Sequence, residues 1–273
     1  MAKHHRIAGG GGVELHAVET GNPTRRPILF LHGISQCWLT WSRQMTSDLA
    51  DDCRLVALDL RGHGLSGRPP GGYDDSTAWA QDVEAVIRAL SLDHPILCGW
   101  SYGPLVILDY IRQCGDDAVG GLHFVGGLTQ LGTERATAAL TPELLALIPG
   151  FFATDAEASV RALESLIRLF FVREQPAEDL FRILGYNMSV PPYVRQAMLS
   201  RSIDNDDLLP RIRKPLLVTH GAADAIVKPA VVEEHKARIP HAQIAIVPDA
   251  GHAVFWDDPA TFNRQLGAFV DGL

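Results

Sequence analysis

The sequence has few cysteines and no long apolar run. Both features limit the kinds of protein that it can encode. Its four cysteines stand at positions 37, 53, 98 and 114, far apart and without Cys-x-x-Cys spacing. This pattern predicts free thiols in a reducing compartment. No stretch approaches the roughly 20 apolar residues of a membrane-spanning helix. Residues 1–12 show neither the apolar core nor the cleavage site of a secretory signal, so we expect a cytoplasmic protein.

Positive charge is also in short supply. Lysine and arginine total 24 against 32 aspartates and glutamates, which gives a formal net charge of −8 and a pI near 5.7. A nucleic acid or an anionic membrane would favour a basic face, so we expect neither as a partner. The 273 residues are 47% hydrophobic and 21% charged, an ordinary globular balance with enough chain for a substantial core. The oligomeric state stays open.

Over most of its length the chain alternates short apolar runs with amphipathic segments. The first 21 residues read as an edge hairpin, because apolar and polar residues alternate before a Gly-Asn-Pro turn. Runs typical of buried strands lie at 27–31, 54–60, 95–100, 121–127, 215–220 and 243–247. Helical spacing is found at 38–50, 76–92, 105–113, 231–238 and 258–269. This alternation predicts a parallel sheet covered by helices on both faces.

The alternation of strand-like and helical segments stops between residues 132 and 207. Strand-like runs vanish there, and helical segments separated by prolines follow one another at 142–148, 156–172, 177–184 and 193–202. We therefore predict an α/β core built from 1–131 and 208–273, with 132–207 inserted as a helical cap in one structural unit.

The stretch Gly99-Trp-Ser-Tyr-Gly103 is the motif on which the functional interpretation depends. It follows a strand-like run and precedes a helix, the setting of a nucleophile elbow with Ser101 at the turn. Two glycines suit a sharp turn that other segments approach closely, because a Cβ at either position would clash. The Gly-x-Ser-x-Gly pattern alone is common in proteins. It therefore indicates a catalytic serine only if the chain also supplies partners for Ser101.

A serine hydroxyl is a weak nucleophile until a base takes its proton. Of the 11 histidines, His252 has the best setting, on a loop between the last strand and the last helix. Asp224 follows the preceding strand and would orient that histidine. Both loops lie at the carboxyl edge of a parallel sheet, as does Ser101. Asp249 is a rival acid, although capping a turn suits it better.

An acyl-transfer site also needs donors for the developing oxyanion. The N–H of Tyr102, next to the nucleophile, is one candidate, and the N–H of Ile34, after the strand at 27–31, is the other. Arg61 and His63 lie in a nearby loop and are interpreted as hydrogen-bonded anchors of that loop. An apolar pocket could be lined by several large side chains: Trp38, Phe151, Phe152, Phe170, Tyr186, Met188 and Trp256.

Five motifs taken in order resemble those of α/β-hydrolase-fold serine hydrolases. They are His32-Gly33, Asp59-Leu-Arg-Gly-His-Gly-Leu-Ser66, the elbow, Gly221-Ala-Ala-Asp224 and Gly251-His252. The resemblance implies the α/β-hydrolase fold, an eight-stranded and mostly parallel sheet flanked by helices, with a helical cap inserted after the sixth strand. Pro104 departs from the small residue that often follows the elbow, but proline is tolerated in the first turn of a helix.

The resemblance also bounds the reaction. Haloalkane dehalogenases and soluble epoxide hydrolases of this fold use aspartate at the elbow, whereas this chain has Ser101. The expected function is a carboxylic ester hydrolase without cofactor or metal, acting on a small apolar ester or lactone. N-acyl homoserine lactones, whose opening quenches quorum sensing, are one candidate, and the metal-binding His-x-His-x-Asp-His cluster is absent. The alternatives are carbon–carbon bond hydrolysis, cofactor-free perhydrolysis, or a ligand-binding receptor on a hydrolase scaffold.

Overall fold

The apolar runs of the sequence form eight strands of a single sheet. The computed structural model describes residues 2–273, and its strands are Lys3–Ala8 (β1), Glu14–Gly21 (β2), Pro27–Leu31 (β3), Arg54–Asp59 (β4), Ile96–Trp100 (β5), Gly121–Val125 (β6), Leu216–Gly221 (β7) and Gln243–Val247 (β8). Their order is β1-β2-β4-β3-β5-β6-β7-β8. β1 pairs antiparallel with β2, and β2 with β4, whereas all later pairs are parallel. The predicted mostly parallel sheet is therefore confirmed.

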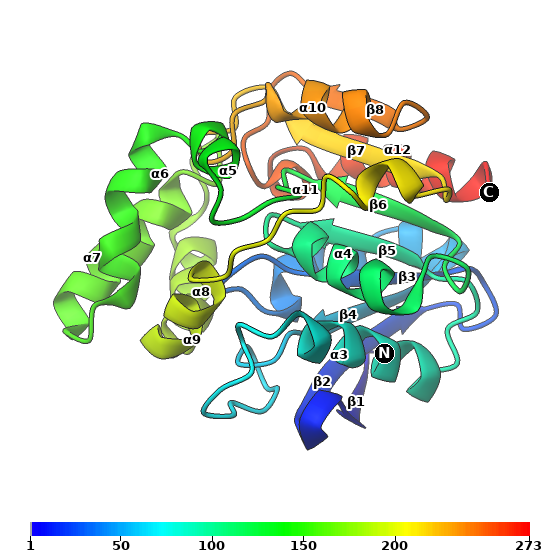
Figure 1. The fold of residues 1–273 in the computed structure, drawn as a ribbon, viewed down its shortest axis with the longest axis horizontal. Coiled ribbons are helices and arrows are strands. Elements are labelled where there is room, and N and C mark those ends of the chain that lie inside the picture. Colours follow the sequence, from blue (N-terminus) through cyan, green and yellow to red (C-terminus); the bar gives the residue numbers. More distant parts are fainter. Residues whose placement is uncertain (1) are drawn as a thin grey trace.

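Helices cover both faces of this sheet (Figure 1). They are Ser42–Met45 (α1), Leu49–Asp52 (α2), Ser76–Ala89 (α3), Gly103–Cys114 (α4), Glu134–Ala139 (α5), Pro142–Leu147 (α6), Ala156–Arg168 (α7), Ala177–Met188 (α8), Pro192–Leu199 (α9), Val231–Arg238 (α10), Val254–Asp257 (α11) and Pro259–Asp271 (α12). Short 3-10 turns lie at Gly10–Gly12, Trp38–Trp41, Ile148–Phe152 and Leu209–Arg211. α3 and α4 pack together in front of the strands, while α1 and α2 contact α12 behind them.

The central strands are buried on both faces, as parallel strands under two helical layers must be. Every residue of β3, β5 and β6 is buried. Behind the sheet, Trp41 fills the space between Phe30 and Phe255, with ring centroids 4.8 and 4.4 Å away. In front, Asp75 caps the start of α3, because its carboxylate accepts the Thr77 N–H, and α3 buries its apolar side against α4.

The prediction of one continuous helix over residues 38–50 is wrong. Residues 38–50 do not form one helix but a 3-10 turn followed by α1 and α2. Two hydroxyls intervene: Thr46 Oγ1 donates to the Ser42 carbonyl at 2.9 Å, and Ser47 Oγ donates to the Gln44 carbonyl at 2.8 Å. Such local side-chain bonds compete with the helical backbone ladder, so the helix stops at Met45.

The helical cap is inserted after the sixth strand, as predicted, and comprises α5–α9 (Figure 1, left). Its neck is a two-residue antiparallel bridge in which the Leu131 N–H donates to the Ile203 carbonyl at 3.0 Å and the Ile203 N–H returns the bond at 2.8 Å. The cap therefore leaves and re-enters the core at one point. The proposed limits of 132–207 stay a prediction. None of the helices found within residues 2–273 has the length and apolar character needed to cross a bilayer.

A buried ion pair ties this neck to the helix after the elbow. Arg201 follows α9, and its Nη2 lies 2.6 Å from Asp109 Oδ2 on α4, while its Nη1 donates to the Tyr102 hydroxyl at 2.9 Å. Burial raises the pKa of the Asp109 carboxyl, and the Arg201 guanidinium counteracts part of that rise. Removing either partner would leave the other charge buried and unpaired.

We expect Arg201→Met to lower the free energy of unfolding by about 3–5 kcal/mol, because the Asp109 carboxylate loses its partner. The matched control is Arg161→Met on α7, whose pair with Glu157 is exposed and contributes about 0.5 kcal/mol or less. Urea unfolding of both variants measures the difference. Adding Asp109→Leu to Arg201→Met is expected to recover stability, and equal losses in the two single variants would contradict the assignment.

Candidate active site

Ser101 lies in the turn between β5 and α4 with a φ of +58°, the left-handed region that side chains seldom adopt. The surrounding packing holds it there. A Cβ added to Gly99 would lie 2.6 Å from the Gly103 backbone carbon, and one added to Gly103 would lie 2.6 Å from the Leu31 carbonyl oxygen. Side chains at these positions would push α4 and β3 away from the turn. The glycines of the motif thus serve the close approach expected from the sequence.

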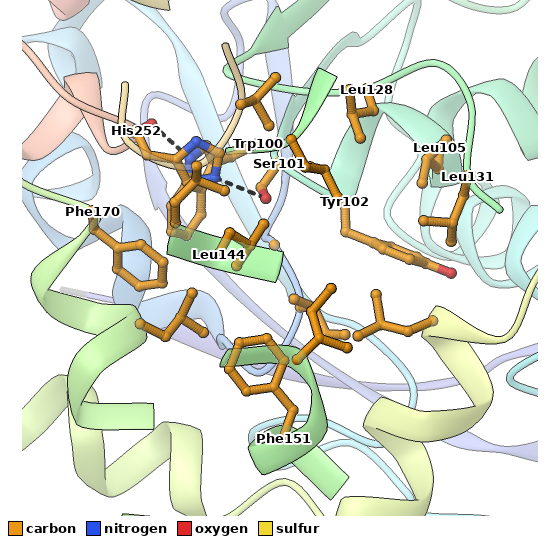
Figure 2. A pocket seen from close by; sticks show the side chains of 18 residues that line it. Trp100, Ser101, Tyr102, Leu105, Leu128, Leu131, Leu144, Phe151, Phe170 and His252 are labelled. Atoms are coloured by element: carbon orange, nitrogen blue, oxygen red, sulfur yellow. Dashed lines mark hydrogen bonds between the residues drawn. The ribbon is translucent and has the colours of Figure 1, made fainter. Parts of the chain in front are cut away.

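Three side chains form a continuous hydrogen-bonded line at the carboxyl edge of the sheet. Ser101 Oγ lies 2.9 Å from His252 Nε2, and His252 Nδ1 lies 2.8 Å from Asp224 Oδ2. Figure 2 shows the Ser101–His252 bond, with the cap side chains Leu144, Phe151 and Phe170 below it in this view. The structure therefore brings together the serine, histidine and acid that the sequence singled out, from the loops after β5, β8 and β7.

The Asp224 carboxylate is buried and accepts several N–H groups. Its Oδ1 accepts the backbone N–H groups of Ile226 and Val227 at 2.8 and 2.9 Å, and its Oδ2 faces both His252 and His220 Nε2, the latter at 3.1 Å. Burial alone would raise the pKa of this carboxyl, but the charge interaction with His252 and the hydrogen bonds from both histidines outweigh it and hold the pKa below its usual range.

Because it stays ionised, Asp224 requires a hydrogen on His252 Nδ1. His252 Nε2 of the neutral ring is then free to accept the Ser101 hydroxyl proton. The rival acid does not take part in this line: Asp249 is exposed, and among residues 2–273 Asp224 is the carboxylate that hydrogen-bonds His252.

The loop after β3 passes directly over the serine. A Cβ on Gly33 would lie 3.0 Å from Ser101 Cβ, so glycine permits this approach. Ile34 and Tyr102 both line the cavity at Ser101, and neither backbone N–H donates to an acceptor within residues 2–273. Two such N–H groups beside a serine can receive a negatively charged oxygen. Their role as an oxyanion hole stays a prediction.

Neighbouring anchors hold this loop. Ser35 has a φ of +62° and donates its N–H to His63 Nε2 at 3.1 Å. His63 Nδ1 donates to the Arg61 carbonyl at 2.8 Å, and burial lowers the pKa of His63 well below its ordinary value, which keeps Nε2 an acceptor. Arg61 bonds both carboxylate oxygens of Asp82 at 2.7 and 2.8 Å. Arg61 and His63 are thus loop anchors, as interpreted from the sequence.

An apolar cavity of about 90 Å³ separates Ser101 from the cap. Its roof comes from the cap residues Leu140, Leu144, Ile148, Phe151, Leu166, Phe170 and Leu199. Among residues 2–273, no lysine, arginine, aspartate or glutamate lines it. The Tyr102 hydroxyl is turned away from Ser101 (Figure 2), toward Arg201 Nη1 and the Met198 carbonyl. The space beside the serine therefore suits an uncharged, apolar group.

Only two of the seven large side chains considered for the pocket line it, Phe151 and Phe170. The others lie elsewhere, which corrects that part of the prediction. Their positions are as follows: Trp38 packs edge-to-face on His4, Phe152 packs half-buried on the core, Tyr186 approaches Thr40 Oγ1, Met188 approaches Ser159 Oγ, and Trp256 stacks under Arg43. The helical pattern of the cap predicts apolar sides but does not say which side faces Ser101.

The sequence interpretation missed three polar residues. Asp257 accepts the N–H of Gly251 at 2.8 Å and that of Val172 at 3.1 Å, so it joins the His252 loop to the cap. Arg201 joins the cap to Tyr102, and His220 touches Asp224. No spacing rule links such residues to the motifs, although a buried charge or imidazole in an apolar run is itself a signal for a partner.

Comparison with known proteins agrees with this fold. The model of the Alpha/beta hydrolase family matches residues 28–265. The crystal structure of an esterase from Rhodococcus sp. ECU1013 aligns with a TM-score of 0.92 and 34% identity over 99% of both chains. The pimeloyl-(acyl-carrier protein) methyl ester esterase of Aromatoleum aromaticum is 31% identical over 86% of this chain and 94% of its own. The 2-hydroxy-6-oxo-2,4-heptadienoate hydrolase of Pseudomonas putida is 26% identical over 97% and 94%.

We expect Asp224→Asn to lower kcat for p-nitrophenyl acetate by about 10³–10⁴-fold, because an amide does not require the Nδ1–H form of His252. Asp249→Asn is the matched control, and its kcat should stay at the wild-type value because Asp249 is exposed. Steady-state kinetics of both variants decide between the two acids. A larger loss in Asp249→Asn would move the orienting role to Asp249.

Proposed function

Since the chain belongs to the α/β hydrolase family, we propose that it hydrolyses small, uncharged carboxylic esters with Ser101 as the nucleophile. The observation that carries this proposal is the 2.9 Å bond from Ser101 Oγ to His252 Nε2 on the wall of an apolar cavity. The esterases among the similar proteins support the same class of reaction.

In the proposed mechanism Ser101 Oγ attacks the ester carbonyl while His252 Nε2 takes the hydroxyl proton. Asp224 stabilises the imidazolium that forms. His252 then donates this proton to the leaving alkoxide, which departs as the alcohol. A water molecule, deprotonated by His252, attacks the acyl-enzyme, and the carboxylic acid leaves as Ser101 regains its proton. No step requires a metal or cofactor.

The carbonyl oxygen becomes negatively charged in both tetrahedral intermediates. We assign the backbone N–H groups of Ile34 and Tyr102 to this oxygen, because both residues line the cavity at Ser101 and neither N–H has a protein acceptor within residues 2–273. One such donor typically contributes about 10²–10³-fold to the rate. The His63 bond to Ser35 keeps the first of these donors in place.

The lining of the cavity supports neutral esters as substrates over the carboxylate-bearing substrates of hydrolases that cleave carbon–carbon bonds. The relative from Pseudomonas putida acts on a heptadienoate, which carries a carboxylate. Here no lysine or arginine of the described chain lines the cavity, so a substrate carboxylate would be buried without such a partner. Such burial is costly by several kcal/mol. The absence of charge in the lining therefore supports a neutral acyl group.

Lactones are cyclic esters, and the same steps would open them. The cavity of about 90 Å³ is smaller than the roughly 150 Å³ cavity known to hold benzene. A long-chain N-acyl homoserine lactone would therefore require the cap to move, whereas an acetyl or butanoyl ester requires less space. We accordingly place short-chain esters ahead of acyl homoserine lactones as substrates.

Ser101→Ala is expected to lower kcat by about 10⁴–10⁶-fold without loss of stability, because the attacking oxygen is gone. Ser165→Ala, at an exposed position of α7, is the control and should behave as the wild type. Hydrolysis of p-nitrophenyl acetate and a thermal melt measure both effects. Retained activity would refute the nucleophile, and tight ester binding by an inactive wild type would favour the receptor alternative.

A matched pair of substrates tests the uncharged pocket. p-Nitrophenyl butanoate and mono-p-nitrophenyl succinate have similar acyl lengths, but the second ends in a carboxylate. We expect kcat/KM to be at least about 10²-fold lower for the succinate, because its charge meets no cation. p-Nitrophenyl octanoate and octanoyl homoserine lactone extend the panel, and both should be poorer than the butanoate. A preference for the succinate would favour the carbon–carbon hydrolase alternative.

A further inference from the structure

A second histidine touches the carboxylate that orients His252. His220 lies in β7, four residues before Asp224, and its side chain is fully buried. Its Nε2 is 3.1 Å from Asp224 Oδ2 and 3.0 Å from the Val227 carbonyl oxygen. The same Oδ2 is 2.8 Å from His252 Nδ1. Two imidazoles therefore share one carboxylate oxygen.

The partners of His220 determine which of its nitrogens carries the hydrogen. Both neighbours of Nε2, a carboxylate and a carbonyl, only accept hydrogen bonds, so Nε2 must be the donor. Nδ1 of the same ring is buried and has no hydrogen-bond partner within residues 2–273. A buried polar atom without a partner is unfavourable, and an apolar residue in this buried strand would avoid that cost. Nε2 has the Val227 carbonyl as its hydrogen-bond partner, and its 3.1 Å approach to Asp224 Oδ2 is the polar contact that an apolar residue would lack.

Apart from His252, the buried imidazole near His220 makes no bond to the Asp224 carboxylate. His252 faces Asp224 from the loop after β8, and His235 on α10 is the second buried imidazole near His220. Burial, followed by the influence of His220 and Arg238, lowers the pKa of His235 to about 3, so it stays neutral in the working range. Neither nitrogen of His235 has a partner within residues 2–273, and neither bonds Asp224.

We propose that His220 is a positioning residue for the proposed hydrolysis: its Nε2–H fixes Asp224 Oδ2 and limits the attraction of that oxygen for the proton of His252. A donor close to Oδ2 spreads its negative charge, so this oxygen attracts the Nδ1 proton of His252 less strongly than an unshared carboxylate oxygen would. The inference rests on the proposed roles of Ser101, His252 and Asp224. His220 touches neither the cavity nor the serine, so it acts through Asp224 alone.

Three variants test this role through the pH profile of kcat/KM. His220→Phe keeps the ring but removes the donor, and it should move the acid limb upward by about half a pH unit or more and lower kcat roughly tenfold, the scale of one hydrogen bond to a charged group. His220→Gln places an amide nitrogen the same number of bonds from Cβ, and it should restore the acid limb and most of kcat. KM for p-nitrophenyl butanoate should stay unchanged throughout.

His235→Phe is the matched control, because it replaces the neighbouring buried imidazole without removing a bond to Asp224. Its acid limb should stay at the wild-type position. An acid limb that moves in none of the three variants, or losses that are equal in His220→Phe and His220→Gln, would overturn the proposal in favour of a packing role.

Nuclear magnetic resonance of the wild-type protein, with ¹⁵N-labelled histidine and direct assignment, tests the bond without any variant. We expect His220 in the Nε2–H form across the active pH range, and the Nδ1–H form would overturn the proposal even if His220→Phe failed to fold. The Ser101→Ala variant distinguishes a failure of the proposed ester hydrolysis from a failure of the proposed role of His220. Activity that survives in Ser101→Ala refutes the proposed function, whereas an Nδ1–H tautomer of His220 refutes its positioning role whatever Ser101 does.

Discussion

At Ser101 the backbone is held in a left-handed conformation because β5, α4 and the loop after β3 meet within van der Waals distance. The glycines at 33, 99 and 103 make this meeting possible, since a Cβ on any of them would contact a neighbouring segment at 3.0 Å or less. The serine hydroxyl consequently lies at the edge of the sheet where β7 and β8 end and their following loops begin. Every other feature of the site is arranged around that fixed oxygen.

Charge around the site is distributed in a consistent way. The buried carboxylates nearby each have donors: Asp224 has two backbone N–H groups and two imidazoles, Asp109 has Arg201, and Asp82 has Arg61. These bonds hold the loops that carry His252 and the neck of the cap. In the part of the chain that the structure describes, no lysine, arginine, aspartate or glutamate lines the cavity itself. The polar groups thus position the serine, while the apolar roof is left to select an uncharged acyl group.

The cap was predictable as an insertion but not as a surface. The loss of strand-like runs after residue 132 predicts helices, and helices are found there. An amphipathic helix, however, has an apolar side that can face the core, another cap helix or the substrate with equal hydrophobic gain. Phe151 reaches the cavity whereas its neighbour Phe152 packs on the core, a difference that no periodicity in the chain encodes.

The sequence by itself determined the order of the strands and helices, the elbow at Ser101, and the loops that bear Asp224 and His252. Glycine sterics and hydrophobic period are properties of short segments, and the carboxyl ends of parallel strands meet at one edge whatever the loops contain. Tertiary structure alone decided the contacts made across the chain. Arg201 reaches Tyr102, Asp257 holds Gly251 and Val172, and His220 shares Asp224 with His252, because packing brings these groups within 3.1 Å of one another.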